Sequence, residues 1–284
     1  MKLRPIHSGE TDAAVTLLAE GFADRSPEAW RAGLERLLAY ASHIGEPSVG
    51  QIVSARGADA GICLTIPSTR TAYTGTPQKV VNLGAFYLRP GHEWMAALLM
   101  RRLAADAAID YTDLTASPSM REINRNVGFE DRSHGALVIP LPAAAFRPGR
   151  SARILRVHDI PTGRISDGHR RLLDEHATLG CVALGVELDG ICHPLICARL
   201  RRRGLPGAQI VLARDRQFIR AALGPIARHL LARGLTFLML PGDDRQGFPE
   251  AVVWAQSAPV QTTRQPEGDA LDFTFSEAVF FQPG

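Results

Sequence analysis

The stretch 87-YLRPGHEWMAALLMRRL-103 decides how this chain is interpreted. An apolar, strand-like run, 79-KVVNLGAFYL-88, ends at Arg89-Pro90, and a pattern with helical spacing begins after the single residue Gly91. The first N–H groups of a helix have no partner within the helix and lie at its positive dipole end, so they suit an anion. The question is whether this turn holds a phosphate or only joins a strand tightly to a helix.

Strand and helix patterns alternate through the first half of the chain. In order, the sequence predicts a strand at 2–6, a helix at 10–22, a helix beginning at 27 after Ser26, strands at 50–56, 60–68 and 79–88, a helix at 93–109, a strand at 110–117, a short helix ending at 128–129 and a strand at 135–141. Helices lying between strands are typical of an α/β protein.

The second half repeats this order after a segment, 142–152, whose Pro, Gly, Ala and Ser lack periodicity and indicate a linker. The predicted elements there are a strand at 153–160, a helix around 167–177, strands at 181–188, 191–200 and 208–213, a helix ending at 233–234, and strands at 235–242 and 277–282. The shared order predicts an internal duplication into domains 1–143 and 151–284.

The composition is that of an ordinary folded chain. Of the 284 residues, 45% are hydrophobic and 21% are charged, which argues against disorder. The formal net charge of +3 is too small to indicate a nucleic-acid surface. The longest apolar stretch, 136-ALVIPLPAAAF-146, is too short to span a bilayer, and the first residues lack the apolar region of a signal peptide. We expect a cytoplasmic protein with neither nucleic acid nor membrane as partner.

The sequence offers little for metal or nucleophile chemistry. Three of its four cysteines, Cys63, Cys181 and Cys192, lie in strand-like surroundings, where a free thiol behaves as a small buried hydrophobe. The segment 192-CHPLIC-197 lacks the spacing of a zinc site, and no second Cys or His pair accompanies it, so no metal is expected. Gly-x-Ser-x-Gly, P-loop, His-Glu-x-x-His and dinucleotide motifs are absent from the sequence.

Three places in the first half resemble the GNAT superfamily of acyl-CoA-dependent N-acyltransferases. The strand 3-LRPI-6 precedes a helix that carries Asp12. The element 87-YLRP-90 ends the central strand and leads into a helix with paired leucines. A strand-helix element ends in Gly-Phe within 123-INRNVGF-129. The second half resembles a more divergent copy with a closing strand at 277-EAVFFQ-282, so the resemblance covers nearly the whole chain.

The resemblance implies an α/β fold with two tandem GNAT-like domains, each a mixed, mostly antiparallel sheet flanked by helices. It implies that the two middle strands of the first sheet separate and that acetyl-CoA or another acyl-CoA enters the gap as co-substrate. The pantetheine would pair with the central strand, the diphosphate would lie on the turn after it, and two serines would lie on the adenine or pantetheine side. The implied donor-binding residues are Ala85, Phe86, Tyr87, Leu88, Gly91, His92, Glu93, Trp94, Met95, Ser117 and Ser119.

The activity implied is a GNAT-type acyl transfer to a small amine acceptor by direct attack on the thioester. Asn124 stands where family members often have a tyrosine that protonates the leaving thiolate. An asparagine can orient a thioester by hydrogen bonding but cannot deliver a proton at neutral pH. Of the family loop Arg/Gln-x-x-Gly-x-Gly/Ala only Gly91 is present, and 214-RDRQFIRAALGP-225 has no glycine turn, so no CoA site is expected in the second half.

Two alternatives stay open. The short turn and Asn124 favour a non-catalytic GNAT-like module that binds an acyl-CoA or a partner protein. An acyltransferase whose donor arrives on an acyl carrier protein would depend less on the diphosphate turn. The arginine run 199–203 predicts either a solvated hairpin tip or a contact with an anionic substrate or an acidic carrier protein. A homodimer is also left open.

Overall fold

The computed structural model describes residues 1–71, 77–149, 152–264 and 270–283. The strands are β1 (Lys2–Pro5), β2 (Gly50–Ala55), β3 (Ala58–Thr71), β4 (Pro77–Leu88), β5 (Asp110–Asp113), β6 (Glu130–Ser133), β7 (Ala136–Pro140), β8 (Arg153–Arg156), β9 (Val182–Leu188), β10 (Ile191–Arg202), β11 (Leu205–Ala213), β12 (Phe237–Pro241), β13 (Val252–Trp254), β14 (Val260–Thr262) and β15 (Leu271–Asp272). The helices are α1 (Thr11–Gly21), α2 (Pro27–His43), α3 (Ala96–Leu103), α4 (Pro118–Asn126), α5 (Leu141–Ala144), α6 (Asp167–Thr178), α7 (Arg216–Leu231) and α8 (Glu277–Phe280). Short 3-10 turns lie at Ser8–Glu10, Glu93–Met95 and Val157–Asp159.

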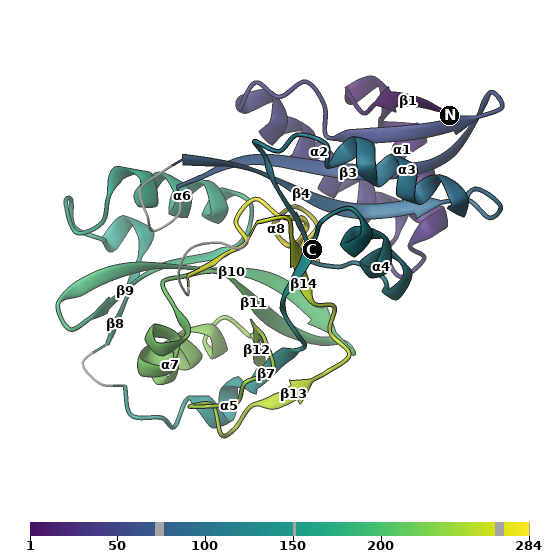
Figure 1. Ribbon diagram of the computed structural model, residues 1–284. Coiled ribbons are helices and arrows are strands. Elements are labelled where there is room, and N and C mark those ends of the chain that lie inside the picture. The colour runs from purple at the N-terminus through teal and green to yellow at the C-terminus, as the bar shows by residue number, and fades with distance from the viewer. Residues whose placement is uncertain (72–76, 150–151, 265–269, 284) are drawn as a thin grey trace.

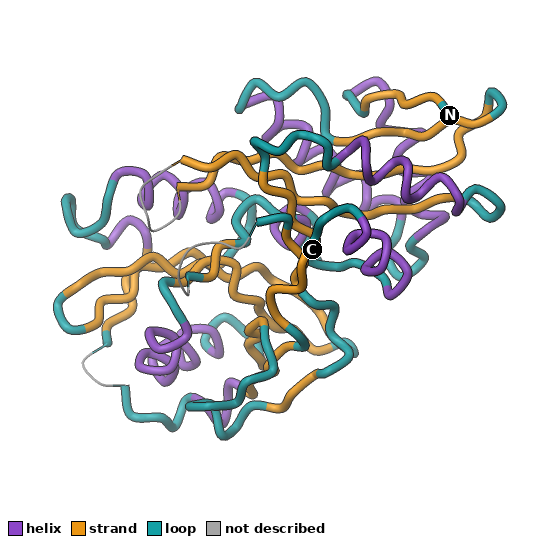
Figure 2. The backbone as a smooth tube through the Cα atoms, in the orientation of Figure 1, coloured by secondary structure: helices purple, strands orange, loops and turns teal. Residues whose placement is uncertain are grey.

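Two mixed sheets carry the core, and Figure 2 shows their strands as two separate layers. The first sheet has the order β1-β2-β3-β4-β5-β14-β6, and the second has the order β13-β7-β12-β11-β10-β9-β8 with β15 beside β11. Each sheet contains one parallel pair, β4 with β5 and β11 with β12, while the other pairs are antiparallel. The expected fold class, two mixed and mostly antiparallel sheets flanked by helices, is confirmed.

The two sheets exchange short strands. β7 follows β6 in the chain, yet it pairs with β12 and β13 of the second sheet. β14 comes from the second half and pairs with β5 and β6 of the first sheet. The division into 1–143 and 151–284 therefore describes the order of elements along the chain, while sheet membership crosses it. As a division into folding units it stays a prediction.

Serine side chains cap the helices α2 and α4. Ser26 accepts a hydrogen bond from the N–H of Ala29 at the start of α2, and Ser117 accepts one from Met120 at the start of α4. In both helices a proline follows the cap, at a position whose missing N–H costs nothing. Within the described ranges, no helix has the length and apolar character needed to cross a bilayer.

Several expected elements differ in the structure. The strand expected at 153–160 is β8 followed by a 3-10 turn, and the strand expected at 110–117 ends at Asp113. The helix expected at 93–109 is a 3-10 turn followed by α3, which ends at Leu103. The strand expected at 277–282 is wrong: the chain forms the one-turn helix α8 there. α8 lies between the two halves in Figure 1 and contacts β4 on one side and β10 on the other. Its apolar side chains Val279 and Phe280 are buried by packing instead of strand pairing.

The segment carrying α8 anchors the halves to each other. Phe280 is fully buried, its ring centroid lies 5.1 Å from that of Tyr40, and its carbonyl accepts two hydrogen bonds from the Arg36 guanidinium. One hydrophobic cluster includes these buried side chains, the face of the first sheet under α1 and α2, and most of the second half. Side chains of α3 and α4 form a separate cluster with β4 and β5.

We predict that Phe280→Ala lowers the free energy of unfolding by about 3–5 kcal/mol, because it leaves a cavity between the two halves. Phe146, which is 90% exposed, provides the matched control, and Phe146→Ala should change stability by less than about 0.5 kcal/mol. Urea denaturation of both variants measures the difference. Equal changes in the two variants would contradict the anchoring role of α8.

Candidate active site

Strands β4 and β5 separate at a bulge in β4. Their parallel pairing ends at Leu83 and Asp113. On the other edge of β4 the register with β3 shifts, so that Gly84 pairs with Leu64 while Tyr87 pairs with Ile62. Ala85 lies in this irregular stretch with φ of +29°, a backbone conformation that residues other than glycine seldom adopt. A bulge bends and twists its strand, and such strain clusters at functional sites. The expected separation of the two middle strands is present at this point.

A buried polar cluster spans the place where the strands part. Asn82 is fully buried, and its amide donates to the backbone oxygen and the hydroxyl of Thr112, both at 3.1 Å. The Asn82 side-chain oxygen accepts the N–H of Glu277 at 2.9 Å. The Glu277 carboxylate accepts the Thr115 hydroxyl at 3.0 Å and, more weakly, the Ala85 N–H at 3.4 Å. The first residue of α8 is thus fastened into the gap between β4 and β5.

The surroundings of Glu277 disfavour its charged form. Removal from solvent raises the pKa of its carboxyl group, the nearby Asp113 carboxyl raises that pKa further, and the Thr115 hydroxyl and the Arg25 guanidinium lower it in part. Burial also raises the pKa of Asp113. A carboxylate whose pKa is raised above its ordinary value binds a proton more tightly and is better suited to take one up.

Asn124, expected to orient the thioester, is fully buried at the end of α4. Its amide nitrogen donates to Asp113 and to Gln261 of β14, both at 2.9 Å. Gln261 in turn donates to Asp131 of β6 at 2.8 Å. Both amide hydrogens of Asn124 therefore help to hold β5, β14 and β6 together. Its side-chain oxygen is buried and has no hydrogen-bond partner in the described part of the chain. The role expected for Asn124 stays a prediction.

The turn expected to hold the diphosphate is open to solvent. Gly91 is exposed, has φ of +84°, and has no atom within 4 Å of where a Cβ would lie. The backbone N–H groups of Glu93 and Trp94 have no backbone acceptor in the described structure, whereas His92 donates to Arg89. Trp94 is 71% exposed, and Met95 is fully buried in the core below. In the described structure the backbone N–H groups of Gly91, Glu93 and Trp94 are thus without a backbone acceptor.

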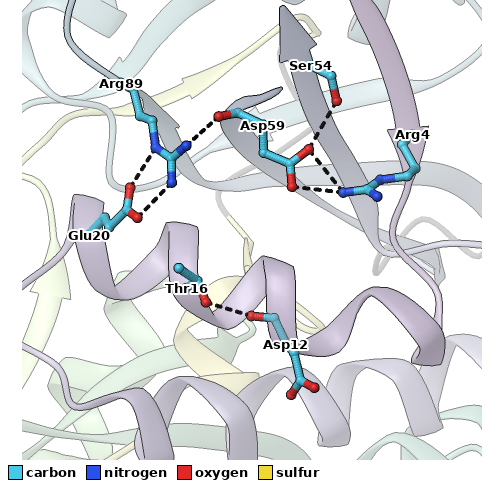
Figure 3. Close-up of polar contacts among 7 residues, drawn as sticks. All are labelled: Arg4, Asp12, Thr16, Glu20, Ser54, Asp59 and Arg89. Carbon is cyan, nitrogen blue, oxygen red and sulfur yellow. Dashed lines mark hydrogen bonds and ion pairs between the residues drawn. The ribbon is translucent and has the colours of Figure 1, made fainter. Parts of the chain in front are cut away.

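Arg89 fixes the end of β4 directly before this turn. Its guanidinium donates two hydrogen bonds, of 2.8 and 2.7 Å, to the Glu20 carboxylate of α1 (Figure 3). A third bond of 2.6 Å reaches the backbone oxygen of Asp59, whose carboxylate is held by Arg4 and Ser54. Since each of its three nitrogen atoms donates to protein, Arg89 holds the end of β4 and thereby the position of the turn.

The remaining expected residues have structural surroundings. Tyr87 packs so closely on α1 that a Cβ at Gly21 would lie 2.4 Å from its ring. Phe86 and Leu88 pack between β4 and α3. Ser117 caps α4, and its hydroxyl lies 3.1 Å from that of Ser119. The donor-binding residues at 85–88 and 91–95 are continuous along one strand and turn, and the two serines begin the neighbouring helix.

A cavity of ≈ 700 Å³ adjoins the gap on the side of the second half. Its wall includes Thr115 and Glu277 from the polar cluster and Arg25 from the loop between α1 and α2. Strands β10, β11 and β12 form the opposite wall, so that both halves are needed to build it. The cavity is of the size that binds a small organic molecule.

The corresponding gap in the second sheet is filled by the chain itself. Parallel pairing of β11 with β12 ends at Gln209 and Met239. Beyond that point β15 pairs with β11, and the Phe273 N–H donates to Val211 at 2.7 Å. The backbone of β11 that would face a pantetheine arm is thus engaged by β15. The expectation that the second half holds no CoA stays a prediction.

The cysteines are free and buried, and burial raises the pKa of Cys181 to about 12. No cluster of three or more potential metal-binding side chains occurs within the described ranges.

The fold matches solved structures, whereas no family model and no curated protein matches the sequence. A GCN5-related N-acetyltransferase from Anabaena variabilis is similar with a TM-score of 0.58 and 10% identity, over 92% of this chain and 72% of that chain. A protein from Pyrococcus horikoshii, provisionally assigned as an acetyltransferase, has a TM-score of 0.58 and 11% identity over 99% and 95% of the two chains. A GCN5-related N-acetyltransferase from Kribbella flavida has a TM-score of 0.54 and 13% identity over 92% and 70%. The chain therefore has the GNAT fold.

Sequence reasoning missed Asn82, Thr115 and Glu277. The motif Glu-x-Val-Phe-Phe was noticed but interpreted as a strand, because consecutive apolar residues suit a buried strand and a buried helix equally. Only the pairing of β14 and the packing of α8 bring Glu277 to β4.

We predict that Glu277→Gln becomes more stable than the unmodified protein as pH rises. A pKa raised above its ordinary value of 4.5 means that Glu277 favours the folded state at pH below that value and disfavours it increasingly as pH rises through the folded-state pKa. Glutamine removes this loss, so the stability difference should grow as pH rises above the ordinary value of 4.5, measured by urea denaturation.

Glu28 of α2 provides a control of opposite sign, because hydrogen bonds lower its pKa. Glu28→Gln should lose stability relative to the unmodified protein as pH rises. A flat difference for Glu277→Gln would contradict the raised pKa of Glu277.

Proposed function

We propose that the protein is an acyl-CoA-dependent acyltransferase that transfers an acyl group to an amine in the gap between β4 and β5. The observation that carries the proposal is the meeting of the Ala85 N–H at the bulge with the buried Glu277 carboxylate, in the wall of a cavity large enough for an acceptor. The GNAT fold supports acyl transfer as the kind of reaction. An acyl-CoA supplies the activated acyl group as a thioester.

In this proposal Ala85 and Glu277 act on opposite sides of the reaction. The Ala85 N–H donates to the thioester carbonyl oxygen and stabilises the negative charge that develops there. Its present bond to Glu277 is long at 3.4 Å, so a carbonyl oxygen can replace the carboxylate while Thr115 still holds it. Glu277 takes a proton from the attacking amine. The new C–N bond forms, the C–S bond breaks, and solvent protonates the departing thiolate.

The donor would lie along β4 and the turn after it. Backbone groups of 85–88 would pair with the pantetheine, and the free N–H groups of Glu93 and Trp94 would bind the diphosphate. Ser117 and Ser119 are exposed at the start of α4, on the side where the adenine or pantetheine is expected.

A donor carried by a protein is the second candidate, and an exposed surface on α3 favours it. Trp94 and Leu98 are 71% and 46% exposed, and Arg101 and Arg102 are exposed on the following turn. An apolar pair beside positive charge suits an acidic acyl carrier protein.

A non-catalytic binding module is favoured by a different observation, namely that the Glu277 carboxylate already accepts the Ala85 N–H at the bulge.

We predict that Gly91→Trp weakens acetyl-CoA binding about tenfold or more, because the indole covers the N–H groups of the turn. Isothermal titration calorimetry measures the affinity. Gly57 is a matched control, since it has the same φ of +84° and equally open surroundings on the β2–β3 turn. Gly57→Trp should share the backbone strain and leave binding unchanged. Equal losses in both variants would remove the diphosphate from this turn.

We predict that Glu277→Gln lowers kcat by about 100-fold or more, because general-base catalysis contributes at least that much. The KM for acetyl-CoA should change little. Free-thiol release with an amine acceptor measures both parameters, and Glu122→Gln on the exposed face of α4 is the control. Full activity of Glu277→Gln would contradict its role as base. Acetyl-CoA binding without thiol release from any amine would favour the non-catalytic module.

A further inference from the structure

Three arginines lie in the wall of the cavity that adjoins Glu277. Arg25 comes from the loop between α1 and α2, and Arg199 and Arg201 come from β10 of the second half. Among the ion pairs of the described residues, none involves any of these three side chains. Asp24 and Glu277 are the acidic residues in the same wall. The cavity therefore has an excess of positive charge.

Arg25 is held in a manner that leaves hydrogen-bond donors unused. Its guanidinium carbon lies 4.5 Å from the ring centroid of Trp30 and 5.6 Å from that of Phe281. Stacking on aromatic faces positions a guanidinium but uses none of the N–H groups at its edge. Its Nη1 atom is buried and has no hydrogen-bond partner in the described structure. A buried donor without a partner costs free energy, which an acceptor group on a ligand would recover.

The rest of the wall is largely apolar. Leu200, Met239, Trp254 and Phe273 contribute to it, all from β10 onward in the chain. An acceptor for this cavity needs an amine that reaches Glu277 and an apolar body that covers these side chains. Because a planar guanidinium matches a carboxylate or a phosphate in two-point hydrogen bonding, a third feature is an anionic group at Arg25.

We infer that the acceptor is an amine that also carries an anionic group, a carboxylate or a phosphate, on an otherwise apolar skeleton, with Arg25 binding the anion. This inference rests on the proposed function for its reaction. Beyond that reaction, it specifies which amines are acylated and which residue selects them. Arg199 and Arg201 add positive charge to the same wall and favour entry of an anionic molecule.

The test compares amines that differ in one charge. 6-Aminohexanoate is compared with its methyl ester, and O-phosphoethanolamine with ethanolamine, in thiol-release assays with acetyl-CoA. We expect the anionic member of at least one pair to have a kcat/KM about tenfold higher, since hydrogen bonds to a charged group are worth that much. The pair that shows the preference tells a carboxylate site from a phosphate site. Neutral members that react as well as or better than the anionic ones would overturn the inference.

Variants locate the preference at Arg25. In Arg25→Gln the ratio of the two kcat/KM values should fall to near one, and in Arg25→Lys it should keep an intermediate value. Arg31→Gln is the control, because Arg31 is paired with Asp12 at 2.6 Å outside the cavity. It should keep the full ratio. An unchanged ratio in Arg25→Gln, with a thermal melting curve showing a folded protein, would also overturn the inference.

Failure of the proposed function gives a different result. If acetyl-CoA binds but no amine releases thiol, calorimetry with 6-aminohexanoate and its methyl ester still tests the anion site. Tighter binding of the acid that is lost in Arg25→Gln would support the site without the reaction. Equal binding of acid and ester would overturn it.

Discussion

The separation of β4 from β5 is the constraint on which the rest of the structure depends. Where the strands part after Leu83 and Asp113, the buried polar side chains beside the gap need hydrogen-bond partners. Asn82 finds its partner in the N–H of Glu277, and Asp113 finds one in Asn124, which Gln261 also holds. Both Gln261 and Glu277 come from the second half. The gap is therefore completed by residues more than 130 positions away in the chain.

The segment 271–277 interacts differently with the two sheets. Residues 271–273 extend the sheet at β11 and fill the second gap, while Glu277 enters the first gap with a side chain only. At the second gap, the backbone of β15 forms the hydrogen bonds that a ligand would otherwise form. At the first gap, the Glu277 carboxylate on a one-turn helix leaves a cavity beside it. The two halves share one architecture but differ in what occupies the gap in the sheet. Function depends on what the gap contains and not on the fold around it.

The two halves each contribute a charged group to the site, Arg25 from the first and Glu277 from the second. Burial places Glu277 where its proton affinity is raised, and the loop between α1 and α2 brings Arg25 near it over the rings of Trp30 and Phe281. Among the described residues, neither side chain has a hydrogen-bonded partner of opposite charge. Buried groups of this kind interact strongly with a ligand that offers the missing proton donor or anion.

The sequence by itself determined the order of elements and the local devices that start and stop them. Ser26 caps its helix, Gly91 makes the turn after β4, and the resemblance to GNAT proteins led to the correct fold class. These features depend on residues a few positions apart, so a linear pattern contains them. The position of Glu277, the exchange of β7 and β14, and the structural bonds of Asn124 were decided only by the tertiary structure. They depend on which strand edges remain free and which apolar faces must be covered after the chain has closed on itself, and no short stretch of sequence contains that information.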